Sequence, residues 1–285
     1  MKKYLLFSIL AASGFLSGCL HSFQNNEQIP LSCSGSSAWS NEIIATAEET
    51  YLYAILANNS YDNHVSSRRV DIDLPSSISL IEAVPNDDVG LAYNVYLKSD
   101  DQTPEVVIAF RGSEPGWLDW FTGNVRGKQL GRALEVFENW KSRDAYSGHE
   151  FSVTGDSLGG SLATQVSLCH PVKIAVSLDT SPRFKSTLCK PDGAILGENN
   201  RHSITERGEI LKWTRLFGRE ATQTYTSLDC QSEGLIGDHN VYGLARCLTR
   251  IASERPDSDA NLVIDLNADI FSKYPASTKS CVSGI

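Results

Sequence analysis

The order of apolar and polar positions divides the chain into segments with helical patterns and segments with strand patterns. Apolar residues recur at helical spacing in four segments, 41–59, 131–143, 160–169 and 240–253. Strand patterns occupy five short runs, at 89–98, 105–110, 150–154, 172–178 and 203–211. Residues 60–88 show no regular pattern, and we expect them to be mostly loop. Because the two patterns alternate through the middle of the chain, we predict parallel strands joined by crossover helices that cover both faces of the sheet.

The N-terminal end of the chain has the pattern of an export signal. Lys2 and Lys3 precede an apolar run at 4–15, which is too short to span a bilayer. The run ends in Leu-Ser-Gly-Cys at 16–19, where a cleavage site is expected. This ending resembles the cleavage box of bacterial lipoproteins, in which the cysteine becomes the new N-terminus and carries lipid. An ordinary signal peptide with an incidental cysteine is the alternative.

The lipoprotein resemblance implies an anchor at Cys19 and a division of the chain into three parts. Residues 1–18 would be the signal peptide, 19–40 a lipidated N-terminus and a tether with little structure, and 41–285 one folded domain. Leu20, in place of an aspartate, implies sorting to the outer membrane. No linker rich in Pro, Gly or Ser divides the remainder, so a single α/β domain is predicted.

The negative net charge of the chain argues against nucleic acid as a partner. Removal of 1–18 takes away two lysines and no acid, so 23 basic and 34 acidic residues remain and the formal charge changes from −9 to −11. A chain with this balance and no basic stripe is not expected to bind nucleic acid.

The cysteines suggest disulfide bonds. Without Cys19 an even set remains: Cys33, Cys169, Cys189, Cys230, Cys247 and Cys281. In an oxidising compartment we expect up to three disulfides among them, with the pairing open. A buried thiol at Cys169, in an apolar helical segment, is an alternative. The chain has no CxxC pair, which disfavours a zinc site, and we expect no metal and no cofactor.

The candidate chemistry lies at the ends of two predicted strands. The first is Gly-Asp-Ser-Leu-Gly at 155–159, which follows a strand and precedes a helix. Glycines on both sides of Ser157 allow a sharp turn that lifts its hydroxyl above the sheet, while the helix N-terminus points N–H groups at a developing anion. The second is Phe-Arg-Gly-Ser at 110–113, a buried strand that ends in a turn where an oxyanion loop is expected.

Together these motifs resemble the class 3 lipase family, the α/β-hydrolases typified by fungal triacylglycerol lipases. The similarity covers about 105–180 and extends more loosely to about 245, and its motifs are FRGSEPGWLDWFTGN at 110–124 and TGDSLGGSLA at 154–163. It implies an α/β-hydrolase fold, with Ser157 as nucleophile and oxyanion contacts from Ser113 and Leu158. The residue before the nucleophile departs from the family pattern, because Asp156 stands where a histidine is usual.

The resemblance also implies the order serine, acid, histidine. Residues 204–211 resemble the strand that carries the acid, and Glu209 occupies its position, with Glu206 and Asp179 as alternatives. Of the two histidines well beyond Ser157, His202 precedes both glutamates, so His239 is the expected base.

The implied activity is hydrolysis of a lipid carboxyl ester, of lipase or phospholipase A type, through an acyl-serine. Two alternatives use the same fold. One is an inactive α/β-hydrolase domain that binds partners in the envelope, and the other is an acyltransferase that shares the acyl-enzyme.

Overall fold

The computed structural model describes residues 27–28, 39–61, 70–99, 103–112, 123–180, 189, 200–206, 223–228, 230 and 241–272 of the chain. The strands are β1 (Glu27–Gln28), β2 (Ile78–Val84), β3 (Tyr93–Lys98), β4 (Glu105–Phe110), β5 (Glu150–Asp156), β6 (Ile174–Leu178), β7 (Asn200–Glu206) and β8 (Gln223–Leu228). The helices are α1 (Asn41–Asn58), α2 (Gly123–Lys141), α3 (Leu158–Cys169), α4 (Val241–Ala252), α5 (Ala260–Leu266) and α6 (Ala268–Ser272).

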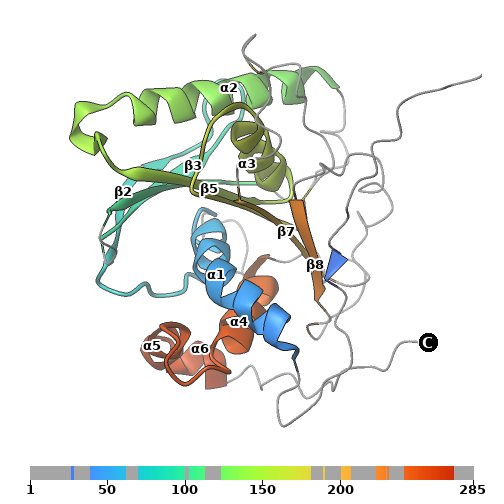
Figure 1. Cartoon of the computed structure of the whole chain (residues 1–285). Coiled ribbons are helices and arrows are strands. Elements are labelled where there is room, and N and C mark those ends of the chain that lie inside the picture. Colours follow the sequence, from blue (N-terminus) through green and yellow to red (C-terminus); the bar gives the residue numbers. More distant parts are fainter. Residues whose placement is uncertain are drawn as a thin grey trace, which may run out of the picture.

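The described strands form one twisted sheet in the order β1-β8-β7-β6-β5-β4-β3-β2. Strands β4 to β8 and β1 pair with one another in the parallel sense, whereas β3 pairs in the antiparallel sense with both β4 and β2. Helices α2 and α3 cover one face, and α1 with α4, α5 and α6 covers the other (Figure 1). This arrangement is the α/β-hydrolase fold, and it confirms the predicted fold class.

Strand β4 contributes side chains to the hydrophobic cores on both faces of the sheet. All six of its residues are buried, which is expected of a central strand covered on both faces. Val107 and Ala109 belong to the core beneath α1, while Val106, Ile108 and Phe110 belong to the core beneath α2 and α3. Because side chains alternate across a strand, a continuous apolar run supplies two cores at once.

Helix α1 is placed by its cap and by its packing. The side chain of Ser40 accepts a hydrogen bond from the backbone N–H of Ile43 at 3.3 Å, as an N-cap residue does. Most of the helix is then buried against the sheet and α4. Its C-terminal end brings Tyr61 to the edge of the sheet where the strands β4 and β5 end.

The structure differs from the sequence prediction at several elements. Residues 60–88 were expected to be mostly loop, but they contain β2, an edge strand in which only Ile78 is buried. The segment 19–40 was expected to lack structure, but Glu27–Gln28 pairs with β8 at the opposite edge. Strand β8 and the short helices α5 and α6 had no predicted counterpart, and α2 begins at Gly123 rather than Gly131.

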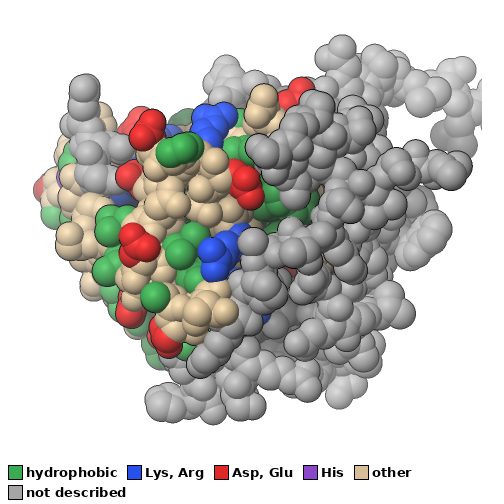
Figure 2. Space-filling view, turned by 90° about the horizontal axis from the view of Figure 1, so that it is seen from below, with side chains coloured by type: hydrophobic (Ala, Val, Ile, Leu, Met, Phe, Trp, Pro, Cys, Tyr) green, Lys and Arg blue, Asp and Glu red, His purple; other side chains and the backbone are tan. Residues whose placement is uncertain are grey.

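Seen from below, the described part of the surface has acidic side chains scattered among hydrophobic and polar ones (Figure 2). Among the described residues, four large hydrophobic side chains are exposed: Val70, Leu80, Leu262 and Leu266. No described helix is both long enough and apolar enough to cross a membrane.

Candidate active site

Ser157 occupies the tight turn between β5 and α3. Its backbone has φ 56° and ψ −115°, a conformation that residues with a side chain rarely adopt. Such a conformation costs on the order of 1–3 kcal/mol and persists only where the surroundings hold it. Here the Ser157 N–H donates to the carbonyl of Leu178 at 2.9 Å, and the Ser157 carbonyl accepts from Ser161 at 3.3 Å. The turn is therefore tied both to the end of β6 and to the first turn of α3.

The glycines around Ser157 are required by close backbone approach. A Cβ atom on Gly159 would lie 2.1 Å from the carbonyl oxygen of Phe110, and one on Gly155 would lie 2.4 Å from the carbonyl of Gly159. A Cβ on Gly160 would come within 2.9 Å of the Thr180 side chain. The spacing G-x-S-x-G-G thus allows α3 to start directly against the ends of β4 and β6, as a nucleophile elbow does.

The turn after β4 lies against Ser157. A Cβ atom on Gly112 would lie 3.2 Å from the Ser157 Cβ and 2.5 Å from the carbonyl oxygen of Asp156. The two motifs, more than forty residues apart in the sequence, therefore meet at the carboxyl edge of the sheet. Ser113, the expected oxyanion residue, follows Gly112 but lies outside the described residues.

Leu158, the other expected oxyanion residue, opens α3 and is buried. The first backbone N–H groups of a helix have no acceptor within it, and they carry the positive end of the helix dipole. The N–H of Leu158 is one of these groups, in the residue that follows Ser157. The local geometry is suited to stabilising an anion at this point.

Two of the three acid candidates lie at the same edge of the sheet. Asp179 follows β6, is fully buried and has a positive φ of 40°. Its Oδ1 accepts a hydrogen bond from the backbone N–H of Glu206 at 2.9 Å, so this carboxylate joins the end of β6 to the end of β7. Glu206 is the last residue of β7 and is buried as well. Glu209 and His239 lie outside the described residues.

A tyrosine that the sequence did not single out lies beside the elbow. The Tyr61 hydroxyl donates to Asp156 Oδ2 at 2.9 Å, and its oxygen accepts from the Gly112 N–H at 3.0 Å. Both side chains are buried, with Tyr61 6% and Asp156 1% exposed. Nothing in the pattern around Tyr61 marks this role. The only sequence signal was the departure from the family pattern at Asp156.

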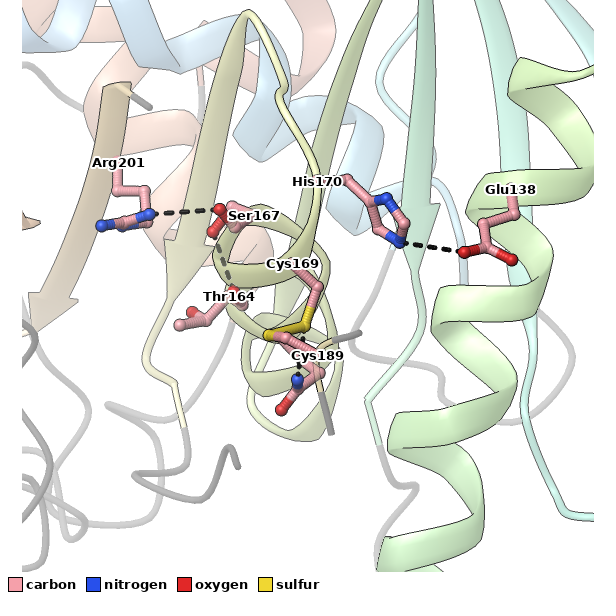
Figure 3. The surroundings of a disulfide bond; sticks show 8 residues. Glu138, Thr164, Ser167, Cys169, His170, Cys189 and Arg201 are labelled. Atoms are coloured by element: carbon pink, nitrogen blue, oxygen red, sulfur yellow. Dashed lines mark hydrogen bonds and ion pairs between the residues drawn. A yellow bond between two sulfur atoms is a disulfide. The ribbon is translucent and has the colours of Figure 1, made fainter. Parts of the chain in front are cut away.

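The C-terminal end of α3 is anchored by a disulfide (Figure 3). Cys169, the last residue of α3, is bonded to Cys189, which excludes the alternative of a buried thiol there. Next to it, the buried Arg201 of β7 donates to the carbonyl of Ser167 at 3.1 Å.

A second disulfide joins Cys230 to Cys247 in α4. The prediction of disulfides is thus confirmed for two pairs, while Cys33 and Cys281 lie outside the described residues.

Within the part of the chain that the structure describes, no group of three or more His, Cys, Asp or Glu side chains is arranged to hold a metal ion.

Comparison with known proteins gives likeness of structure only. No family model matches the chain, and no curated protein matches it significantly. Among solved structures, it resembles the Lip2 lipase of Yarrowia lipolytica at 16% identity and a TM-score of 0.45, over 75% of this chain and 97% of that one.

Two further lipases resemble the chain at a similar level. The lipase of Rhizopus microsporus var. chinensis is 14% identical, with a TM-score of 0.41, over 70% of this chain and 81% of that one. The Rhizomucor miehei lipase in its propeptide complex is also 14% identical, with a TM-score of 0.40, over 63% and 66%. Identities this low carry no information about substrate.

Proposed function

We propose that this chain is a serine ester hydrolase of the class 3 lipase type that cleaves lipid carboxyl esters through an acyl-serine intermediate. The observation that carries the proposal is the conformation of Ser157, held at φ 56° between a strand and a helix, with the Gly112 turn against its side chain. Strain of this kind at a polar residue is typical of an active site. The FRGS and GDSLGG motifs support the same assignment.

In the proposed reaction His239 is the general base. It accepts the Ser157 proton as the hydroxyl oxygen attacks the ester carbonyl carbon, and it returns that proton to the leaving alcohol. The oxyanion of the tetrahedral intermediate accepts hydrogen bonds from the N–H of Leu158 and from Ser113. Each such donor typically contributes about 3 kcal/mol of transition-state stabilisation. Water, activated by His239, then attacks the acyl carbon and releases the carboxylic acid.

Glu209 is the proposed acid that orients His239 and stabilises its imidazolium. Of the alternatives, Asp179 is the weaker choice, because it precedes residues 204–211, which resemble the acid-bearing strand of the family. Glu206 ends β7 at the correct edge of the sheet and is the closer alternative. Single changes to the amide, Glu209→Gln, Glu206→Gln and Asp179→Asn, separate the three, because only loss of the true acid removes the carboxylate that holds the imidazole tautomer.

We further propose that the protein is anchored by lipid at Cys19 and that it lies in the cell envelope, on the outer membrane. The Leu-Ser-Gly-Cys sequence and the following Leu20 support this location. Radiolabelled palmitate should be incorporated into the full chain and not into a Cys19→Ser variant. Incorporation into both would contradict the assignment of the lipid to this cysteine.

The hydrolase proposal is tested with the full chain in detergent, using p-nitrophenyl esters, triacylglycerols and phospholipids as substrates. Ser157→Ala should abolish hydrolysis of every substrate that the unaltered protein cleaves. Ser142→Ala, which changes an exposed serine just after α2, is the matched control and should leave hydrolysis unchanged. Equal rates for the two variants would reject the assignment.

A further inference from the structure

Three groups from separate parts of the chain form a hydrogen-bonded series directly behind the nucleophile. The Gly112 N–H follows β4, the Tyr61 hydroxyl follows α1, and the Asp156 carboxylate ends β5 next to Ser157. The two bonds measure 3.0 Å from Gly112 N to Tyr61 Oη and 2.9 Å from Tyr61 Oη to Asp156 Oδ2. We propose that Tyr61 and Asp156 are positioning residues that hold the oxyanion turn against the nucleophile. This inference rests on the proposed hydrolase function.

The direction of the two bonds is fixed by the chemistry of the groups. A backbone N–H can only donate, so the Tyr61 oxygen must accept from Gly112. The single proton of the Tyr61 hydroxyl is then directed to Asp156, whose oxygen must be an acceptor. An ionised carboxylate is an acceptor only, and hydrogen bonds to it are stronger than those between neutral groups. Asp156 therefore sets the orientation of the Tyr61 hydroxyl, which in turn sets that of the Gly112 amide.

This arrangement also defines which amide is left for the substrate. The Gly112 N–H is directed at Tyr61, so a donor from this turn to a substrate oxygen has to come from the residues after Gly112. Ser113, the proposed oxyanion residue, is joined to Gly112 by a peptide bond but lies outside the described residues. The series thus links the Asp156 carboxylate to Gly112, the residue before the proposed oxyanion donor.

The packing around Gly112 leaves no space for a side chain at this position. A Cβ atom there would lie 2.4 Å from the Tyr61 oxygen and 2.5 Å from the carbonyl oxygen of Asp156. Gly112 is therefore enclosed by the Tyr61 hydroxyl that it binds and by the backbone of Asp156. Catalytic donors must be held within a few tenths of an ångström of the transition-state oxygen, and a misplacement of about 1 Å can cost about 100-fold in rate.

The test compares variants of the full chain by steady-state hydrolysis of a p-nitrophenyl ester and by the rate of fluorophosphonate labelling. Tyr61→Phe and Asp156→Ala should each lower kcat by about 10- to 100-fold, with KM changed less than about twofold. Asp156→Asn keeps an oxygen acceptor for Tyr61 and should recover most of the lost kcat. The double variant Tyr61→Phe with Asp156→Ala should be no slower than the worse single variant, because both changes break one series.

Tyr53→Phe is the matched control. Tyr53 also lies on the α1 side of the sheet and donates to a buried carboxylate, Glu105 Oε1, at 2.7 Å, but Glu105 begins β4 whereas Gly112 follows its end. This variant should lose stability without loss of kcat. Equal kcat for Tyr61→Phe and Tyr53→Phe would overturn the positioning role. Wild-type protein that is neither active nor labelled would instead overturn the hydrolase proposal, and this inference with it.

Discussion

Gly159 lies against the carbonyl oxygen of Phe110, so closely that a Cβ atom on Gly159 would be 2.1 Å from that oxygen and 2.8 Å from the carbonyl carbon. Phe110 ends β4, and Gly159 lies in the first turn of α3. The contact joins α3, which follows Ser157, to the strand that leads into the Gly112 turn. Because both partners are backbone, neither can rotate away to admit a side chain.

Gly159→Ala should therefore destabilise the protein by at least the roughly 1–3 kcal/mol that is typical of overpacked cores. It should also lower activity, since α3 can admit the methyl group only by moving away from β4. Chemical denaturation of the variant measures the first effect, and ester hydrolysis by the remaining folded protein measures the second.

The matched control for this change is a glycine in a helix with open space around it. A Cβ atom on Gly131 in α2 or on Gly243 in α4 would meet no atom within 4 Å. Alanine at either position should raise stability by about 0.5–1 kcal/mol, because glycine loses more backbone freedom on folding. A loss of stability at these positions comparable with that of Gly159→Ala would contradict the steric explanation.

The disulfide between Cys169 and Cys189 closes a segment of 20 residues, and that between Cys230 and Cys247 closes one of 17. Loops of this length predict a contribution of about 3 kcal/mol from each bond, through restriction of the unfolded chain. Replacing both cysteines of one pair by serine should lower the free energy of unfolding by about this amount. The melting temperature should then respond less to reductant than that of the unaltered protein. An unchanged response would show that the deleted bond had no role in stability.

Glu105 is fully buried at the start of β4, where it accepts from the Tyr53 hydroxyl at 2.7 Å and lies 3.2 Å from the Lys173 ammonium. Tyr53→Phe leaves one oxygen of this buried carboxylate without its donor. The expected loss is about 1–3 kcal/mol in the free energy of unfolding. Glu150→Gln is the comparison at the surface. Glu150 also pairs with Lys173, but its side chain is 42% exposed. This substitution should cost no more than about 1 kcal/mol.

Acid should weaken the contact between α1 and β7. Hydrogen bonding to His202 holds the pKa of Glu49 below its ordinary value of 4.5, and the charge of His202 and a hydrogen bond from Asn200 act in the same direction against the effect of partial burial. A carboxyl whose pKa is lower in the folded state stabilises the protein above its unfolded pKa, and this contribution is lost as the pH falls through the folded pKa.

Glu49→Gln should therefore lower stability near neutral pH and have little effect in acid. Because the Glu49 side chain is 45% exposed, the difference should be less than about 1 kcal/mol. Denaturation at about pH 6.5 and about pH 3.5 measures the change, with Glu254→Gln, an exposed residue after α4, as control. A cost that is the same at both pH values would show that ionisation of Glu49 is not its source.

The sequence predicted the central part of the fold well, because strands that are buried on both faces have continuous apolar sequences that are easily recognised. Strand β4 has the predicted bounds, and β5 and β6 differ from the prediction by only two residues at one end. Strands β2 and β8 were missed for the opposite reason. Only Ile78 of β2 is buried, and β8 is mostly polar, so neither has the composition of a buried strand.

The candidate site was predictable where the chemistry is local in sequence. The elbow at Ser157 follows from the glycines beside it and from the strand and helix patterns around them. The contact between Tyr61 and Asp156 was not predictable, because it joins residues 95 positions apart and depends on where α1 ends against the sheet. Only three-dimensional packing brings that hydroxyl to the carboxylate.

The identity of Ser157 as the nucleophile is tested most directly by covalent labelling. The full chain is treated with a fluorophosphonate probe, and the modified peptide is identified by mass spectrometry. We expect one labelled residue, Ser157, with labelling lost in Ser157→Ala and retained in Ser142→Ala. Absence of labelling in the unaltered protein, or labelling that persists in Ser157→Ala, would contradict the central claim.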